Sequence, residues 1–335
     1  MNARERILPV FVPHLGCPHA CVFCNQNRIT GQEKSADAQT VYAALQRCRT
    51  LFGRESACQL AFYGGSFTAI PVSLQEELLG AAQEALQQGE IDSIRLSTRP
   101  DAIDDAVLAR MKHYGVKTVE LGAQSMDDEV LRLSGRGHTA AEVVSASQAV
   151  QRAGFRLILQ MMTGLPGDTP EKALKTAKQI IALHPDGVRI YPAVIVRDTA
   201  LFELWQAGTY REHTVEKAVS LCAQLLPLFD AAGIPVIRLG LNPTEDLSAG
   251  AAVAGAYHPA LGELVKSRVL RNHVESLLTA QPKKREVTVM VHPSKVSQMT
   301  GQKRCNILWL QEHFSLSAVK IVASGDLKAN EVRIL

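Results

Sequence analysis

Short apolar runs alternate with helical patterns along the first two thirds of this chain. Six runs have the length and composition of strands, and they cover residues 7–12, 58–63, 93–97, 117–121, 156–160 and 187–191. Helical periodicity separates them, for example near 73–88 and 103–113. Strands separated by helices predict an α/β fold built from parallel βα units rather than hairpins. The right-handed crossover rule then leaves a doubly wound sheet or a full or partial barrel.

In either arrangement, functional residues belong at the carboxyl ends of the strands. Four segments fall there: a cysteine-rich loop after the first strand, Gly64–Gly65, Arg99–Asp101 and Gly164–Gly167. We therefore expect these segments to lie together at one edge of the sheet.

Cysteine usage and charge narrow the class of protein. The 335 residues include seven cysteines, of which three lie between residues 17 and 24, so metal binding fits better than a disulfide framework. The net charge of +3 permits an anionic partner without requiring one. The N-terminus lacks the long apolar region of a signal peptide, and no run of 18 apolar residues occurs. We expect a cytoplasmic protein without a membrane partner.

The cysteine loop has the spacing C-x3-C-x2-C at Cys17, Cys21 and Cys24. Three thiolates this close can bind three irons of a [4Fe–4S] cluster, and no fourth cysteine lies nearby. The remaining iron can bind the amino and carboxylate groups of S-adenosylmethionine (SAM). A reduced cluster can then cleave SAM to a 5′-deoxyadenosyl radical, chemistry that belongs to the cofactors.

Other interpretations of this loop stay open. His14 or His19 could complete a Cys3His zinc site, Cys21 and Cys24 could form a redox pair, or the thiols could be buried without a ligand. The downstream FYGGSFTAI segment favours the cluster. It places Gly64, Gly65 and Ser66 directly after a strand, where glycines let the backbone approach a ligand closely. Taken alone, this segment would indicate an ordinary turn.

Seven motifs occur in order over roughly residues 7–211: GCPHACVFC, GGSFTA, STRPD, VELGAQS, RGHT, MMTGLPG and RIYPAVIVRDTALFELWQAGTY. On these motifs the chain resembles the radical SAM domain of Elongator catalytic subunits, which modify wobble uridine in tRNA. It is more distantly similar to the oxygen-independent coproporphyrinogen oxidases. The resemblance implies a partial (β/α)6 barrel with SAM at its mouth, and an electron donor of flavodoxin or ferredoxin type.

The resemblance also implies roles for individual residues. Cys17, Cys21 and Cys24 would ligate the cluster. The implied cofactor contacts are Phe23 at the adenine, Gly64, Gly65 and Ser66 at the methionine end, Ser97, Glu120 and Gln124 near the ribose and substrate, and Arg136 at the SAM carboxylate.

The implied catalytic residues are Glu120, Gln124 and Gln160. Two of the barrel-mouth positions depart from the family pattern. Ser97 stands where these families usually carry Glu, and Gln160 stands where they carry His or Asp. These departures leave the ribose contacts and the later radical chemistry open. The alternative for Glu120 and Arg136 is a solvated or ion-paired charge at a helix end.

The pattern changes near residue 240, and we predict three parts: a barrel over 1–240, a connecting segment over 241–283, and a small α/β module over 284–335. The module has the order strand–helix–loop–helix–strand and resembles the βααβ core of a KH domain. Gly301, Gln302, Lys303 and Arg304 would form its RNA-binding GxxG loop, although Arg304 replaces the second glycine. The cluster at 283–285 adds positive charge. The alternative is a small cap that closes the barrel or pairs subunits.

The leading hypothesis is a radical SAM enzyme that modifies an RNA, with tRNA as a candidate. One alternative is a radical SAM enzyme acting on a small metabolite or tetrapyrrole. Another is a non-catalytic, metal-containing RNA-binding protein. Nothing after residue 240 resembles the acetyltransferase domain of Elongator, so a carboxymethyl-type product is not assumed.

Overall fold

A computed structural model of the chain describes residues 6–12, 15, 17, 21–25, 36–52, 58–244, 247–280 and 284–335. His14 and His19, the possible zinc ligands, and Lys283 of the basic cluster lie outside the described residues. Among the described helices, none is both long and apolar enough to cross a membrane.

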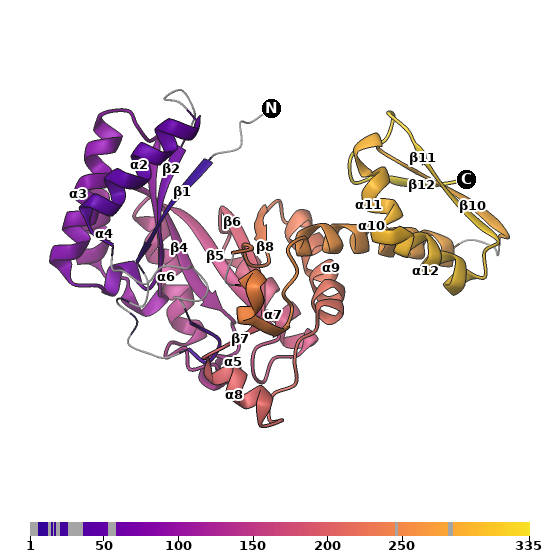
Figure 1. Cartoon of the computed structure of the whole chain (residues 1–335), viewed down its shortest axis with the longest axis horizontal. Helices are drawn as coiled ribbons and strands as arrows, with labels where there is room; N and C mark the ends of the chain where they lie inside the picture. The colour runs from indigo at the N-terminus through magenta and orange to yellow at the C-terminus, as the bar shows by residue number, and fades with distance from the viewer. Residues whose placement is uncertain are drawn as a thin grey trace.

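Seven parallel strands form one curled sheet in the order β1-β2-β3-β4-β5-β6-β8 (Figure 1). The strands are β1 (Arg6–Val12), β2 (Cys58–Gly64), β3 (Ser93–Thr98), β4 (Val116–Gln124), β5 (Arg156–Thr163), β6 (Gly187–Pro192) and β8 (Val236–Leu239). Neighbours in the sheet are also neighbours along the chain, which confirms the partial barrel and excludes a doubly wound sheet. The six predicted strands are all present, and β8 is a seventh that the sequence analysis did not identify.

Helices cover the outer face of this sheet. They are α2 (Ala38–Phe52), α3 (Val72–Gln87), α4 (Asp105–His113), α6 (Ala140–Arg152), α7 (Pro170–Ala182) and α9 (Val215–Ala231). Two shorter helices, α5 (Asp128–Leu133) and α8 (Ala200–Gln206), lie near the carboxyl ends of the strands (Figure 1). An antiparallel pair, β7 (Val194–Val196) and β9 (Ala252–Gly255), forms a separate small sheet.

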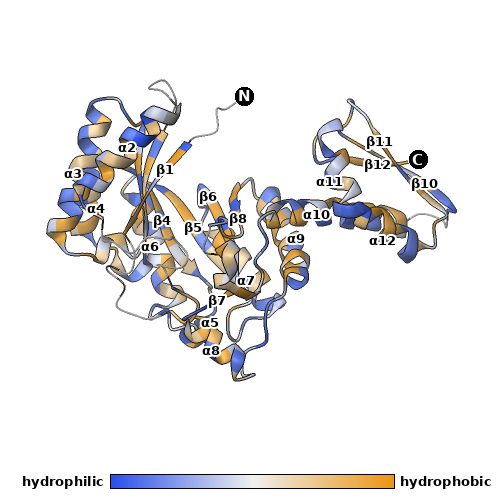
Figure 2. Ribbon diagram, in the orientation of Figure 1, coloured by the Kyte–Doolittle hydropathy of each residue, from blue (hydrophilic) through white to orange (hydrophobic). Residues whose placement is uncertain are grey.

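The two faces of the curled sheet differ in chemistry because strand side chains alternate. The outer face belongs to the main apolar core, with Leu60, Leu96 and Leu121 fully buried under the helices. In Figure 2 the strands accordingly carry long hydrophobic stretches. The alternate positions face inward and include buried charges such as Arg95 and Glu120.

The predicted functional segments meet at the carboxyl edge of the sheet. Gly64 ends β2, Arg99 precedes the single-turn helix η2 (Pro100–Ala102) that follows β3, and Gly164 follows β5. A second single-turn helix, η1 (Phe67–Ala69), follows the Gly64–Gly65 turn.

The C-terminal module has a three-stranded sheet of order β11-β10-β12. Its elements are β10 (Glu286–Val291), α11 (Val296–Thr300), α12 (Cys305–Phe314), β11 (Ala318–Ala323) and β12 (Val332–Ile334). The predicted strand–helix–loop–helix–strand order is present. The antiparallel strand β12 is an addition.

One long helix, α10 (Leu261–Thr279), lies within the segment predicted as a connection. Its first half contributes Leu261 and Val265 to the barrel core. Its second half contributes Leu270, Val274 and Leu278 to the separate core of the C-terminal module. In Figure 1 this helix extends from the barrel to the module. The connection is therefore a shared structural element rather than a loose linker.

Candidate active site

The described part of the cysteine loop is hydrogen-bonded to two short helices at the mouth of the barrel, which is the opening at the carboxyl ends of its strands. The Val22 amide donates to the Ser134 carbonyl at the end of α5 (3.1 Å), and the Leu201 amide in α8 donates to the Val22 carbonyl (2.7 Å). Val22 and Phe23 pack beside the buried Ile195 and Leu201. Phe23 is thus half-buried against an apolar cluster.

The turn after β2 requires glycine for two reasons. Gly64 has φ +104°, a conformation that L side chains rarely adopt, and a Cβ on Gly65 would lie 2.0 Å from the Leu15 carbonyl oxygen. The Gly65 amide donates to the Val12 carbonyl (2.8 Å), and the Ser66 amide donates to the Leu15 carbonyl (3.2 Å). The turn therefore holds the start of the cysteine loop against the sheet.

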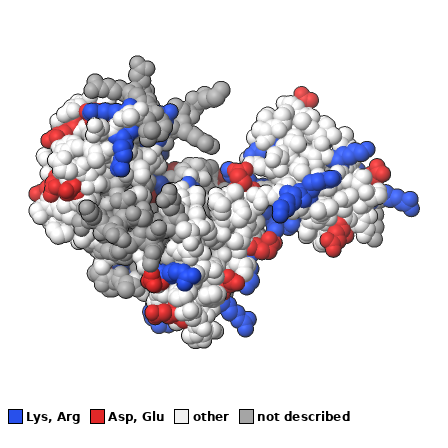
Figure 3. Space-filling view, viewed as in Figure 1, with Lys and Arg blue, Asp and Glu red and all other residues white. Residues whose placement is uncertain are grey.

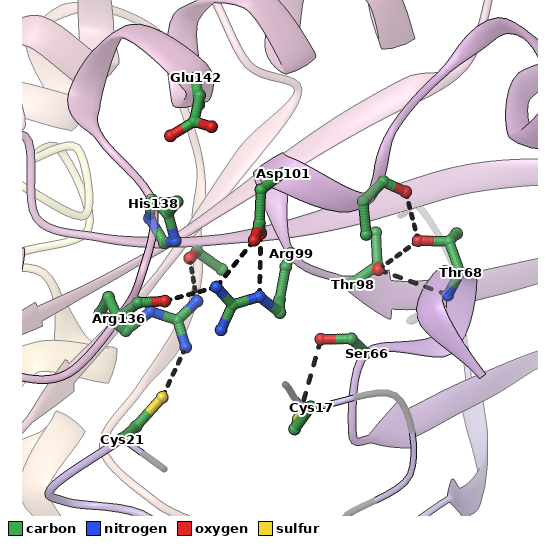
Figure 4. A network of polar contacts seen from close by, with 12 residues as sticks. Cys17, Cys21, Ser66, Thr68, Thr98, Arg99, Asp101, Arg136, His138 and Glu142 are labelled. Carbon is green, nitrogen blue, oxygen red and sulfur yellow. Dashed lines mark hydrogen bonds and ion pairs between the residues drawn. The ribbon is translucent and has the colours of Figure 1, made fainter. Parts of the chain in front are cut away.

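Cys17 and Cys21 contact different sides of the mouth (Figure 4). The Cys17 Sγ lies 3.8 Å from the Ser66 hydroxyl oxygen, and the Cys21 Sγ accepts a hydrogen bond from Nη1 of Arg136 (3.2 Å). Nη2 of Arg136 donates to the Gly122 carbonyl at the end of β4 (2.7 Å). Arg136, predicted as a carboxylate contact, is thus adjacent to Cys21, and the Cys24 amide donates to the Cys21 carbonyl (3.0 Å). The three cysteine side chains do not converge on one point in the described residues.

Arg99 holds the backbone of Arg136 in place. Its guanidinium donates two hydrogen bonds of 2.9 Å to the Asp101 carboxylate and another to the Arg136 carbonyl oxygen. Burial alone would raise the pKa of Asp101, but the hydrogen bonds from Arg99 hold it below its usual value. The pair stays ionised and fixes the backbone at Arg136.

His138 lies behind the same arginines and is 4% exposed. Burial and the nearby Arg136 charge lower its pKa to about 4, so the imidazole is neutral at physiological pH. Its Nε2 lies 3.2 Å from the Ala123 carbonyl oxygen, which fixes the proton on that nitrogen.

Glu120 is fully buried at the centre of a polar network on the inner face. Its Oε1 accepts hydrogen bonds from Arg95 (2.6 Å), Arg189 (2.9 Å) and Tyr63 (3.1 Å). Its Oε2 accepts from Gln160 (2.9 Å). The carboxylate is therefore ion-paired, as one of the alternatives expected, but it is buried within a strand and lies neither in solvent nor at a helix end.

Ser97 lies beside this network, and Gln124 lies at the end of the strand that carries Glu120. Gln160 also approaches the Ser97 hydroxyl (3.5 Å), so these two departures from the family pattern contact each other. Gln124 ends β4 with φ +63°, and its side-chain oxygen is buried without a hydrogen-bond partner among the described residues. A non-glycine residue in this conformation is held there by its surroundings.

The mouth contains several buried polar atoms that lack a partner in the described part of the chain. They are Nη1 of Arg99, Nε of Arg136, Oε1 of Gln124 and Nδ1 of His138. Unpaired buried polar groups are costly, so their grouping here indicates a polar ligand. Over the same residues, no three Cys, His, Asp or Glu side chains converge on a point that could hold a single metal ion.

The predicted RNA-contacting turn lies between α11 and α12, away from the mouth. Gln302, Lys303 and Arg304 are exposed, and both basic residues have positive φ, at 50° and 63°. The buried Asn306 fixes this turn by donating to the Met299 carbonyl (3.1 Å) and to Ser267 of α10 (2.9 Å to the hydroxyl). The turn is rigid and presents two cations to solvent.

Sequence reasoning missed the partners of Glu120, namely Tyr63, Arg95 and Arg189. A signal was present, because charged residues at alternate positions of otherwise apolar strands indicate a polar inner face. It also missed the supporting roles of Arg99 and His138, which only the meeting of distant loops creates.

Comparison with known families gives two adjacent matches. Residues 11–180 match the family model of the Radical SAM superfamily, and residues 185–271 match the Radical_SAM C-terminal domain. The first match spans half of the chain and contains the described cysteine positions, the Gly64–Gly65 turn and Arg136. The second ends inside α10.

Curated relatives are identical to this chain at about a quarter of the aligned positions. Elongator complex protein 3 of Schizosaccharomyces pombe is 26% identical, over 89% of this chain and 62% of that protein. A tRNA uridine(34) acetyltransferase of Methanocaldococcus infernus is 25% identical, over 77% of this chain and 55% of that protein. The chain therefore spans little more than half the length of these relatives.

A solved structure has the same fold. The archaeal Methanocaldococcus infernus Elp3 with an N-terminal deletion superposes with a TM-score of 0.63 at 22% identity, covering 85% of this chain and 66% of that one. The likeness thus extends beyond the barrel.

Proposed function

This chain belongs to the radical SAM superfamily, and we propose that it is a radical SAM enzyme that modifies an RNA, with tRNA as the first candidate substrate. The cofactors of the family are a [4Fe–4S] cluster and SAM. When bound, they supply reductive cleavage of SAM to a 5′-deoxyadenosyl radical. The remaining steps depend on what the residues of this chain bind, orient and exclude.

The mouth of the barrel fits these cofactors. Cys17, Cys21 and Cys24 would provide three thiolates, which leaves one iron for SAM. The unpaired Nε of Arg136 and Oε1 of Gln124 offer a buried donor and a buried acceptor to a ligand that carries both a carboxylate and hydroxyl or amino groups. This pairing of orphaned donor and acceptor supports the cofactor assignment.

The turn at Gly64–Ser66 would meet the methionine end of SAM. Because the Gly65 and Ser66 amides already donate to the cysteine loop, the groups left for an ammonium are carbonyl and hydroxyl oxygens. Phe23, held in its apolar cluster, would contact the adenine. Glu120 would act by holding Arg95 and Arg189 in place rather than by binding ribose directly.

The substrate assignment rests mainly on the relatives, two of which are an Elongator subunit and a tRNA uridine acetyltransferase. The exposed, rigid basic turn at Lys303–Arg304 supports it, because such a turn can contact a phosphate backbone. In Figure 3, Lys and Arg side chains lie over α10 and at the outer edge of the C-terminal module. We further propose an electron donor of the flavodoxin or ferredoxin type, since reductive cleavage consumes an electron.

The first experiment measures SAM cleavage. Anaerobically reconstituted protein, given dithionite and SAM, should release 5′-deoxyadenosine, and a tRNA pool should accelerate the release more than a pool of small metabolites does. Cys21→Ala should abolish the release, while Cys305→Ala, at an exposed cysteine of the C-terminal module, should retain it. Acceleration by small molecules alone would move the assignment to a metabolite enzyme.

The second experiment measures RNA binding across a salt series. Lys303→Asn/Arg304→Asn removes two charges while keeping residues that tolerate positive φ. This variant should bind tRNA more weakly and show a shallower dependence on salt. Lys320→Asn/Lys328→Asn removes two exposed charges elsewhere in the module and should bind like the wild type. Equal binding by all three proteins would refute a contact at this turn.

A further inference from the structure

A layer of charged side chains crosses the inner face of the barrel, beyond the cofactor contacts. It contains Arg95 of β3, Glu120 of β4, Arg189 of β6 and Arg238 of β8. Arg189 and Arg238 are direct partners in the register of the two last strands of the sheet. Like charges at such positions repel each other, so this pair needs a compensating group.

Within the described residues, carboxylates neutralise only part of the positive charge of these arginines. The Glu120 Oε1 is shared between Arg95 (2.6 Å) and Arg189 (2.9 Å). Arg238 donates from Nε to the Gly240 carbonyl (3.0 Å) and forms no ion pair with a carboxylate in the described part of the chain. Among the described ion pairs, Arg189 therefore has only a share of the Glu120 carboxylate and Arg238 has none, so the Arg189–Arg238 pair carries positive charge that this carboxylate does not fully neutralise.

One donor of this pair is also unfilled, although Nη2 of Arg189 donates both to the Tyr63 hydroxyl (2.7 Å) and to Glu120 (2.9 Å). Arg189 is 9% exposed, and its Nε has no hydrogen-bond partner among the described residues. Its Nη1 reaches the Tyr191 hydroxyl at 3.3 Å, a long contact that leaves the phenol able to donate elsewhere. Burial, and to a smaller extent the charge of Arg189, lower the pKa of Arg238, although Tyr191 opposes the shift. A half-buried cation that lacks an ion-pair partner among the described residues is stabilised by an anion placed beside it.

The pair lies apart from the residues proposed for SAM. The cysteine loop follows β1 at one edge of the sheet, whereas Arg238 lies in β8 at the opposite edge. The SAM carboxylate already has a proposed partner in Arg136, which contacts Cys21. An anion at Arg189 and Arg238 would therefore be a different group.

We propose that Arg189 and Arg238, with Tyr191, bind an oxyanion of the substrate inside the barrel. Paired guanidinium groups match the geometry of phosphate and carboxylate oxygens. The site is half-buried, so the oxyanion enters with the reacting part of the substrate. This inference deepens the proposed function and rests on it in one respect: for an RNA substrate, the oxyanion is the phosphate next to the target nucleotide.

The test is a binding experiment that needs no turnover. Uridine 5′-monophosphate is titrated into the reconstituted protein at constant ionic strength and followed by 31P line broadening. Uridine, the phosphate-free probe, is titrated separately, and both compounds are also followed by 1H line broadening so that their binding can be compared. Acetate is then added as a competitor, which tests whether the site accepts a carboxylate as well as a phosphate. Arg238→Gln should weaken binding of the monophosphate about tenfold, the usual effect of losing one charge-assisted hydrogen bond. Arg238→Lys, which keeps the charge, should lose less.

Arg156→Gln is the matched control, because Arg156 is an exposed arginine at the opposite, amino end of β5. It should bind the monophosphate like the wild type. Displacement of the monophosphate by acetate supports an oxyanion site that also accepts carboxylates, and monophosphate binding that resists acetate assigns the site to phosphate. The proposal is overturned if neither anion binds, or if Arg238→Gln and the wild type bind the monophosphate equally. Failure of tRNA to stimulate SAM cleavage would instead count against the RNA substrate and leave this binding result unaffected.

Discussion

Arg136 by itself connects the cysteine loop, the end of β4 and the loop after β3. Its guanidinium contacts the Cys21 sulfur and the Gly122 carbonyl, and its own carbonyl accepts a hydrogen bond from Arg99. A donor directed at a cysteine sulfur stabilises added negative charge on a cluster bound there. The residue therefore has an electronic role available to it besides any contact with SAM.

Arg136→Gln should make the reduction potential of the reconstituted cluster more negative. The loss of one charge-assisted hydrogen bond, about 1.4 kcal/mol, corresponds to about 60 mV for a one-electron couple. Potentiometry followed by electron paramagnetic resonance measures the shift. Arg132→Gln, at an exposed residue of α5, is the control. An unchanged potential in Arg136→Gln would rule out the electronic role.

His138 gives the mouth a dependence on pH. Its pKa is about 4 in the folded protein and about 6.5 when unfolded, so between these values the unfolded chain binds more protons. The contribution of the neutral His138 imidazole to the unfolding free energy is fully present above about pH 6.5, and it is lost as the pH falls toward 4. Relative to His138→Gln, the wild type should lose about 2 kcal/mol of unfolding free energy between pH 7 and pH 5. Denaturant titrations at the two pH values measure this, and parallel pH profiles would contradict it.

Among the elements, the turn after β2 and the cysteine loop depend on each other. The loop runs back over Gly65 closely enough that two of its carbonyls accept amide protons from the turn. Glycine at this position is required by the close approach of the Leu15 carbonyl, not by its own torsion angles. The position of the cysteines is therefore set by a segment about 45 residues later in the chain.

Gly65→Ala should displace the cysteine loop and reduce the iron content after reconstitution, with little change in circular dichroism, because the clash is confined to the mouth. Gly80→Ala is the matched control: it lies within α3 with no atom close to its added Cβ. That control should keep its iron and gain about 0.5–1 kcal/mol in unfolding free energy, because alanine favours the helix. Full iron content in Gly65→Ala would show that the loop can move without losing the cluster.

At the scale of the whole molecule, α10 decides how the barrel and the C-terminal module behave together. The helix is buried in both apolar cores, and Asn306 ties the α11–α12 turn to its Ser267. Unfolding either core would expose half of a continuous helix. We therefore expect the two parts to unfold as one cooperative unit.

Val289→Ala in the module and Val188→Ala in the barrel test this coupling, since both residues are fully buried. Each should cost about 2 kcal/mol by creating a small cavity. Calorimetry should show a single transition that moves down in both variants. A second transition, with each substitution lowering only one of the two, would show that the parts unfold independently.

The six main strands of the barrel and the sheet edge at which the motif segments meet were predictable because they depend on local periodicity and short motifs. Periodicity left a doubly wound sheet and a barrel open, and the partial barrel was implied only by the family resemblance. The strands missed are β7, β8, β9 and β12, which are only three or four residues long and carry little pattern. The helix α10 was overlooked because a Gly- and Ala-rich segment precedes it. The alternation of charged and apolar residues indicates a polar inner face, but which residues contact Glu120 was not predictable, since they come from four strands whose register the sequence does not display.

The amino-acid sequence by itself determined the α/β class, the family and the position of the three cysteines, because alternating periods of burial and closely spaced ligands are properties of neighbouring residues. Tertiary structure alone decided that Arg136 contacts Cys21, that Glu120 is ion-paired, and that Arg189 and Arg238 lie side by side. These contacts arise where the sheet curls and brings distant strands together. The strength of the interactions between these charges depends on their burial and on the distances between them, both of which are set by the curling of the sheet.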